Sequence, residues 1–500
     1  MLNNLFYSVT PKVLIAIFPF IQIHLIGVNS VGDTITVITS VSFILVGVLS
    51  ALCNDIILRD LVKLKVENES ASFHELAYTL LCMAIASALL GAVVNTVLVS
   101  AVLKYQALVS LNIKQVVWLI FWYSINVSVT IVSNFGRVYV VAVRGVRSAN
   151  NVLLIQGVLA NGVMLLSYTK FNVLAPALGL IISNAVSLLC FLKIMVGDGI
   201  FRQKLDSHVV HRYLTSVQVR TLVCGHCVML LVTPIIELIA TSLGPGLGVA
   251  YSWCTKAIQI PQGLILGPLL ENISVGMMRL QFSGKISLTE MSTRMIHIIN
   301  YVSTPLAVLA YIGFCMAFTV LEGFKMVPET LSRSAEIVVP ILLLTLPASI
   351  VTGFNSRLIS IKQELGYITA IGLLSQLGII ILSFVVPRYL GIAGLAVSRV
   401  LFETFLLVPS GFMVLRYIGC YNNSKELSVQ FLKSAASVVL IIIVLDFVNK
   451  TILSLPVFLD YVLLKLIVQI CALFAVAWIV WRRVKRVLSD GVIRSLLRQA

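Results

Sequence analysis

The sequence predicts an all-α polytopic membrane protein with about 14 transmembrane helices. Of its 500 residues, 59% are hydrophobic and only 11% are charged. Apolar runs of about 20 residues recur from Lys12 to Trp481, and each is long enough to cross the hydrocarbon core of a bilayer as a helix. These runs are continuously apolar rather than alternating, which excludes a transmembrane β-barrel. The polar stretches between them are too short for a separate soluble domain.

Proline, glycine and charge clusters mark where the predicted helices begin and end. The first apolar run lacks the small-residue cleavage site of a signal peptide, so we expect it to be the first transmembrane helix. In chain order, the predicted helices cover residues 11–28, 33–57, 74–103, 115–143, 150–167, 173–195, 218–242, 246–278, 291–320, 335–354, 363–386, 392–418, 429–447 and 459–481.

The lysines and arginines predict the orientation of these helices. If the N-terminus is cytoplasmic, most of them fall in the cytoplasmic connectors and in the C-terminal tail. Because basic residues are retained on the cytoplasmic side of membranes, we expect both termini in the cytoplasm. The same rule accounts for most of the net charge of +16, so no nucleic-acid partner is needed, and membrane lipids are the expected surroundings.

A weak internal repeat predicts two six-helix halves, which we call lobes, of parallel orientation. The repeat consists of small residues that recur at an offset of about 215 positions. They are Gly32 and Gly47, matched by Gly248 and Gly263, and Gly179 and Ser183, matched by Gly394 and Ser398. The predicted domains are an N-terminal lobe with a cytoplasmic linker (1–215), a C-terminal lobe (216–428), and two extra helices with a basic cytoplasmic tail (429–500).

The stretch from Gly248 to Leu280 is the strongest functional signal. It is long enough to span a bilayer, yet Lys256 lies early in it, and Pro261 and Gly263 lie near its middle. Hydrocarbon solvates neither a charge nor a carbonyl group freed by proline, so both are costly at membrane depth. We therefore expect this stretch to face a water-filled cavity.

Other ionisable residues within the predicted helices extend this hypothesis. Lys12 lies at the mouth of the first helix and Arg399 within the twelfth, so each could face the cavity, although Lys12 could instead snorkel to the headgroups. Cations facing a cavity predict an anionic substrate, and a pyrophosphate group fits them. Glu237 follows Pro234 in the seventh helix, where it could accept a proton or a sodium ion, or pair with one of the cations.

Enzyme signatures are missing from the sequence, which contains no Walker lysine loop, GxSxG elbow or HExxH helix. We expect a protein that is not an enzyme and that holds no cofactor or metal ion.

The helix-eight region also resembles a known family. Tyr251 is followed five positions later by Lys256, then by Gln-Ile-Pro-Gln-Gly (259–263) and by a run that ends at Arg279-Leu280. This pattern resembles the lipid II flippase (MurJ/MviN) family of the multidrug/oligosaccharidyl-lipid/polysaccharide (MOP) exporter superfamily. Gly32-Asp33 and the apolar span after it are similar to that family's entry into helix two. The resemblance implies 14 helices, as two six-helix lobes and an extra pair.

Carried over by position, the family's cavity arginines of helices eight and one fall on Lys256 and Lys12, and its helix-two acid falls on Asp33. Two further family arginines fall on Phe18 and Val46, so this chain departs from the pattern and resembles a divergent member. We expect Lys256, Lys12, Asp33 and Arg399 to bind substrate.

The resemblance implies a flippase that moves an undecaprenyl-pyrophosphate-linked saccharide across the bacterial inner membrane by alternating access. Its substrate would be a lipid II-type peptidoglycan precursor or an exopolysaccharide repeat unit, and cell-envelope glycan synthesis enzymes are its expected partners. Two alternatives remain open. One is a cation-coupled multidrug exporter of the same superfamily, and the other is a non-transporting scaffold of a polysaccharide-synthesis complex.

Overall fold

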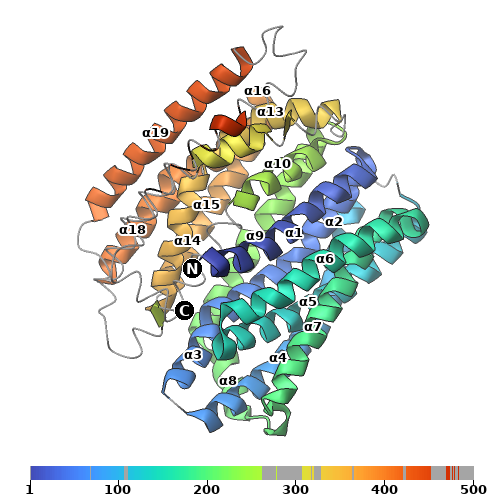
Figure 1. Ribbon diagram of the computed structural model, residues 1–500, viewed down its shortest axis with the longest axis vertical. Coiled ribbons are helices and arrows are strands. Elements are labelled where there is room, and N and C mark those ends of the chain that lie inside the picture. The colour runs from blue at the N-terminus through green and yellow to red at the C-terminus, as the bar shows by residue number, and fades with distance from the viewer. Residues whose placement is uncertain are drawn as a thin grey trace.

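The computed structural model confirms an all-α membrane protein (Figure 1). It describes residues 2–67, 69–105, 111–261, 277–278, 307–316, 318–319, 328–362, 365–419, 424–451 and 469–472, with residues 474, 476, 478 and 482. Within this part of the chain, six helices are individually long and apolar enough to cross a membrane. The protein is therefore a multi-pass membrane protein.

The described helices follow the predicted order. They are α1 (Leu2–Ile26), α2 (Ser30–Leu52), η1 (Cys53–Ile57), α3 (Leu58–Val66), α4 (Ser70–Tyr105), α5 (Ile113–Arg144), α6 (Val146–Phe171), η2 (Asn172–Leu174), α7 (Ala175–Gly197), η3 (Ile200–Arg202), α8 (Ser207–Thr215), α9 (Val217–Leu243), α10 (Leu247–Pro261), α13 (Glu329–Leu343), α14 (Leu346–Ile361), α15 (Leu365–Val385), α16 (Pro387–Leu390), α17 (Ile392–Phe402), η5 (Glu403–Leu407), α18 (Val408–Tyr417) and α19 (Ser424–Thr451). Most of predicted helices 291–320 and 459–481, and the second half of 246–278, lie outside the described residues.

The tenth predicted helix is broken, which the sequence analysis missed. It consists of α13 and α14, whose axes differ by 47°. Pro347 stands at the second position of α14, and a proline ring clashes with the carbonyl group four residues earlier. That carbonyl belongs to Leu343, the last residue of α13, so Pro347 accounts for the break.

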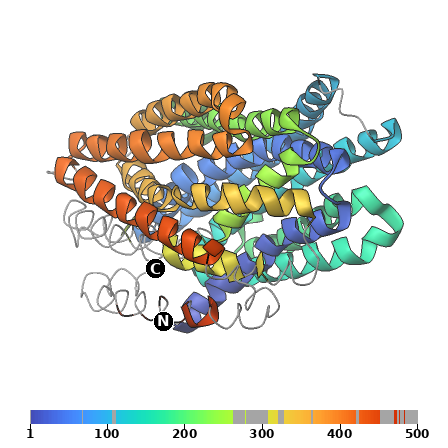
Figure 2. The ribbon, with the colours of Figure 1, turned by 90° about the horizontal axis from the view of Figure 1, so that it is seen from above.

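Helix pairs pack in a pattern that recurs in the two halves of the chain. In the first half, α1 packs on α6, α5 on α7, and α6 on α7. In the second half, the helices at corresponding positions pack in the same way, α9 on α15, α13 on α17, and α15 on α17. The two groups lie side by side, with α4 to α7 on one side of the molecule and α14 to α19 on the other (Figures 1 and 2). The boundaries 1–215, 216–428 and 429–500 stay a prediction.

The lobes meet where α2 packs on α9 and where α1 packs on α10. The second contact includes an edge-to-face pair of Phe20 and Trp253, whose ring centroids lie 5.1 Å apart. These four helices therefore surround the space between the lobes.

Candidate functional site

A cavity of about 300 Å³ lies among α1, α2, α6, α7, α9 and α10. Helices of both lobes contribute to its wall, and most of the wall is apolar. Its lining residues are Ile15, Phe18, Pro19, Gln22, Thr39, Ser40, Phe43, Ile44, Gln156, Ala160, Leu180, Ser183, Leu230, Thr233 and Lys256. Such a combination of apolar walls and a few polar groups is typical of sites for amphipathic small molecules.

Lys256 lines this cavity, as the sequence predicted for a basic residue at membrane depth. It lies in the third turn of α10 and is half-buried. Among the described residues of the wall, it is the only ionisable one. Within the described part of the wall, Lys256 is therefore the cation that an occupant of the cavity meets.

Glu237 is not among the residues that line the cavity. It is buried in α9, and its carboxyl group interacts with the hydroxyl groups of Ser40 and Ser252 and with the charge of Lys256. Its Oε2 atom has no hydrogen-bond partner. Glu237 thus interacts electrostatically with Lys256. Its predicted pairing with a cation and its predicted role in carrying a proton or an ion both stay predictions.

A network of amide side chains extends from the cavity into the first lobe. Gln156, which lines the cavity, donates from Nε2 to Oδ1 of Asn184 at 2.5 Å. Asn184 in turn donates from Nδ2 to Oδ1 of Asn126 at 2.8 Å and to Oγ1 of Thr130 at 3.0 Å. The sequence analysis missed this network because it considered only ionisable residues. Uncharged amides within apolar helices were the available signal, since buried amides need hydrogen-bond partners.

Asp33 caps the N-terminus of α10, across the boundary between the lobes. Its Oδ2 accepts from the backbone N–H of Gly246 at 2.7 Å, and its Oδ1 accepts from that of Val249 at 2.8 Å. A carboxylate at a helix N-terminus neutralises N–H groups that lack intrahelical partners. Asp33 thus connects α2 of one lobe to α10 of the other, while the direct substrate contact expected of it stays a prediction.

Close packing accompanies this connection. A Cβ atom added to Gly248 would lie 3.0 Å from Oδ1 of Asp33, and one added to Gly32 would lie 3.0 Å from Cγ2 of Val249. Gly32 and Gly248 are the pair from which the sequence analysis inferred a repeat. Their reciprocal contacts place equivalent positions of the two lobes against each other, as a pseudo-twofold relation requires.

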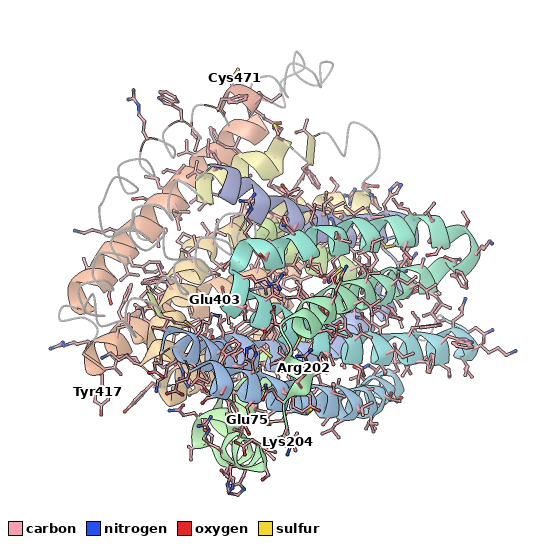
Figure 3. The ribbon with its side chains drawn as sticks, turned by 60° about the horizontal axis from the view of Figure 1, so that its bottom comes forward. Glu75, Arg202, Lys204, Glu403, Tyr417 and Cys471 are labelled. Carbon is pink, nitrogen blue, oxygen red and sulfur yellow. The ribbon has the colours of Figure 1, made fainter. Side chains whose placement is uncertain are left out.

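Arg399 forms an ion pair in the second lobe instead of lining the cavity. Its Nε donates to Oε1 of Glu403, one turn later, at 2.7 Å. Ser349 of α14 donates to the other carboxylate oxygen at 3.4 Å. Figure 3 shows Glu403 within the bundle. The charge of Arg399 is therefore balanced by a neighbour, and its expected substrate contact stays a prediction.

Lys12 lies in the interior of α1, because this helix begins nine residues before the predicted start at residue 11. The apolar part of this helix, Val13–Ile26, starts directly after Lys12, so its predicted position at the mouth of the membrane span stays a prediction. The Lys12 side chain lies outside what the structure describes. Phe18, where the resemblance leads one to expect an arginine, lines the cavity. Val46, the second such position, is buried against Ala88 and Val127.

The described residues contain no group of three or more His, Cys, Asp or Glu side chains that could hold a metal ion.

Comparison with known proteins identifies the fold. No family model matches the sequence, and no curated protein matches it. Several solved structures, however, match the fold of this chain. A crystal structure of the Vibrio cholerae MATE transporter VcmN, in mutant form, covers 87% of this chain and 97% of its own, with a TM-score of 0.58 at 12% identity.

Two further structures agree with this match. An outward-facing MATE family transporter of the MOP superfamily has a TM-score of 0.60 at 12% identity and covers 88% of this chain and 95% of its own. A MOP superfamily transporter from Pyrococcus furiosus, reported with a binding pocket of reverse polarity, has a TM-score of 0.59 at 12% identity, with coverages of 88% and 96%. The chain has the fold of MATE transporters, and the resemblance to the MurJ/MviN family is not confirmed.

Proposed function

We propose that this protein is a transporter of the MOP superfamily that exports amphipathic organic anions by alternating access between its two lobes. The shared fold supports transport, since the solved structures that match nearly the whole chain are MATE transporters. One observation carries the substrate class. The cavity between the lobes is largely apolar, and Lys256 supplies its charge.

The apolar wall would hold the hydrophobic part of the substrate, and Lys256 would hold its anionic group by a charge-assisted hydrogen bond. Glu237 would compensate the charge of Lys256 when the cavity is empty, because an isolated cation at this depth is costly. Binding of an anion at Lys256 would then favour protonation of Glu237. In this way, the pair would couple substrate binding to proton uptake.

A cavity lined by a cation is compatible with the fold. The transporter from Pyrococcus furiosus shares the fold and is reported with a binding pocket of reverse polarity. The fold thus accommodates pockets of different charge, and substrate class follows from the residues of each chain.

Export can be tested in cells that lack their own efflux transporters. We expect expression of the wild-type protein to protect such cells against an anionic amphiphilic inhibitor more than against a cationic analogue. Lys256→Gln should abolish the protection, whereas Lys256→Arg should retain part of it. Protection against the cationic analogue alone would refute the proposed substrate class.

A second candidate function is the flipping of an undecaprenyl-pyrophosphate-linked saccharide. The observation that favours it is again Lys256, which lines the cavity and stands in the stretch that resembles the helix-eight region of the MurJ/MviN family. A pyrophosphate headgroup needs several cations, however, and Phe18 and Val46 replace two of them. This loss favours a smaller anion.

The lipid intermediates of a depleted bacterial strain distinguish the two candidates. Accumulation of lipid II, or of a longer undecaprenyl-linked repeat unit, would support a flippase and identify its substrate. Unchanged intermediates, together with lost resistance to anionic amphiphiles, would support the exporter. A scaffold of a polysaccharide-synthesis complex would instead keep its activity when Lys256 is neutralised.

A further inference from the structure

A second cavity lies at the end of the bundle where α3 and α8 meet, far along α2 from the Asp33 cap. Its volume is about 300 Å³. It is lined by Ile56, Arg59, Asp60, Lys63, Leu64, Leu76, Arg212, Tyr213, Ser216, Gln218 and Val219. Figure 1 shows α3 and α8 side by side at this end. The cavity thus joins the first lobe to the connector that leads into α9.

This second cavity is basic. Arg59, Lys63 and Arg212 line it, against one acid, Asp60. That acid is already neutralised, because Arg59 donates to its Oδ1 from Nε at 3.1 Å and from Nη2 at 2.9 Å. Tyr213 donates to the other oxygen, Oδ2, at 2.5 Å. Lys63 also lies 3.9 Å from the carboxylate of Glu67, but both side chains of this pair are exposed, so the pair is weak. Arg212 lies over the ring of Tyr213. A ligand can therefore engage the charge of Arg212, and that of Lys63 in competition with Glu67.

Tyr213 is fixed as a hydrogen-bond donor in this arrangement. Burial, and then the neighbouring charge of Asp60, raise the pKa of Tyr213 above its usual value. The phenol group therefore stays protonated at physiological pH and keeps its hydrogen bond to Asp60. This bond ties α8 to α3 and closes one side of the cavity.

Arg59 carries an unused donor. The residue is only 6% exposed, and its Nη1 atom is buried without a hydrogen-bond partner. An unpartnered group of a buried cation is costly, and an anion in the cavity would offset that cost. A site that contains an unsatisfied buried guanidinium nitrogen and two further cations is suited to a phosphoryl group.

Apolar side chains beside the cavity place it at the surface of the bilayer. Leu214 is 62% exposed, and Val217, the first residue of the membrane-spanning α9, is 75% exposed. Exposed apolar side chains at the start of a spanning helix are covered by lipid, so the cavity lies at the level of the headgroups. Its basic character matches the side that the positive-inside rule predicts to be cytoplasmic.

We propose that the cavity formed by Arg59, Lys63, Arg212, Tyr213 and Ser216 binds the phosphoryl headgroup of an anionic phospholipid. The lysine and arginine side chains hold the phosphate oxygens, while the acyl chains lie along Leu214 and Val217. The lipid thereby holds α3 of the first lobe to the connector before the second. This site lies apart from the transport cavity, and its occupancy does not depend on the proposed transport function.

Lipid binding can be measured on the purified, delipidated protein in detergent. The probes are dioctanoyl phosphatidylglycerol, dioctanoyl phosphatidylcholine and inorganic phosphate, followed by native mass spectrometry and by thermal shift. We expect saturable binding of phosphatidylglycerol and not of phosphatidylcholine. Displacement of phosphatidylglycerol by inorganic phosphate at a comparable concentration would overturn the lipid proposal. It would show that the site binds a phosphoryl group, but that of a soluble phosphate compound.

Two exposed cations provide the test variant. Each basic residue near an anionic headgroup strengthens binding about fivefold. The double substitution Lys63→Gln, Arg212→Gln should therefore weaken phosphatidylglycerol binding roughly thirtyfold. Charge reversal by Lys63→Glu should weaken it as well. The matched control, Lys114→Gln with Arg333→Gln, removes two exposed cations elsewhere and should leave binding unchanged. Absence of saturable binding to the wild type, or equal loss in test and control variants, would overturn the proposal.

Discussion

Removal of the Asp33 carboxylate should loosen the contact between the lobes. In the Asp33→Ala variant, the backbone N–H groups of Gly246 and Val249 both lose their acceptor. A hydrogen bond to a charged group contributes about 1.5–3 kcal/mol, so two bonds amount to about 3 kcal/mol at the lower end. We use the lower end because water can reach a helix N-terminus once the contact opens. An energy of about 3 kcal/mol corresponds to a population change of roughly a hundredfold.

Hydrogen–deuterium exchange measures this effect directly. Exchange of the peptide spanning residues 244–251 should be roughly a hundredfold faster in Asp33→Ala than in the wild type, because the amides of Gly246 and Val249 are no longer bound. The Asp33→Asn variant keeps one acceptor oxygen and should show an intermediate rate. Asn112→Ala removes a local cap of α5 and serves as the control, since it should leave this peptide unchanged. Unchanged exchange in Asp33→Ala would refute the capping role.

Two further predictions concern packing and the second lobe. Gly136→Ala should destabilise the protein by about 1–3 kcal/mol, because the new Cβ atom would lie 2.7 Å from Cβ of Phe191. In the control variant Gly162→Ala, the new Cβ atom meets nothing within 4 Å, so the substitution should be neutral or stabilising. Thermal unfolding in detergent compares the stability of the two variants. Arg399→Ala should cost about 2–4 kcal/mol, because it leaves the carboxylate partner buried without its counter-charge. Arg333→Ala breaks an exposed pair of the same spacing, and an unfolding midpoint that falls as far as in Arg399→Ala would contradict the argument.

Much of the fold was predictable from the sequence because the bilayer constrains it so strongly. Apolar runs of spanning length have few alternatives to helices in hydrocarbon, so the order and approximate ends of the described helices follow from composition. The break before Pro347 was missed because the run continues through it, and only the position of the carbonyl group of Leu343 locates the bend.

The candidate site was predictable only in part. Lys256 was recognisable because a cation within an apolar run needs a polar surrounding, and it does line the cavity. The same reasoning applied to Arg399, yet its charge is balanced within one helix by Glu403. Sequence reasoning located both cations at membrane depth but could not distinguish a cavity from an ion pair, because the distinction depends on which helix face meets which neighbour.

Asp33 illustrates a different limit. From the family resemblance, the sequence analysis expected it to contact substrate, and that expectation stays a prediction. The structure uses its carboxylate to cap α10, across the boundary between the lobes. No local pattern reveals such a partner, which becomes visible only when the two halves are placed together.

Transport by the purified protein in proteoliposomes is the most direct test of the central claim. The claim is that Lys256 selects amphipathic anions in the cavity between the lobes. Wild-type protein should transport a fluorescent amphiphile bearing one sulfonate saturably and faster than its quaternary ammonium analogue. Lys256→Gln should slow sulfonate transport at least roughly tenfold, because the substrate loses one charge-assisted hydrogen bond. Lys256→Arg keeps the charge and should retain part of the transport rate. Equal sulfonate transport by Lys256→Gln and the wild type, or preference for the ammonium analogue, would contradict the account.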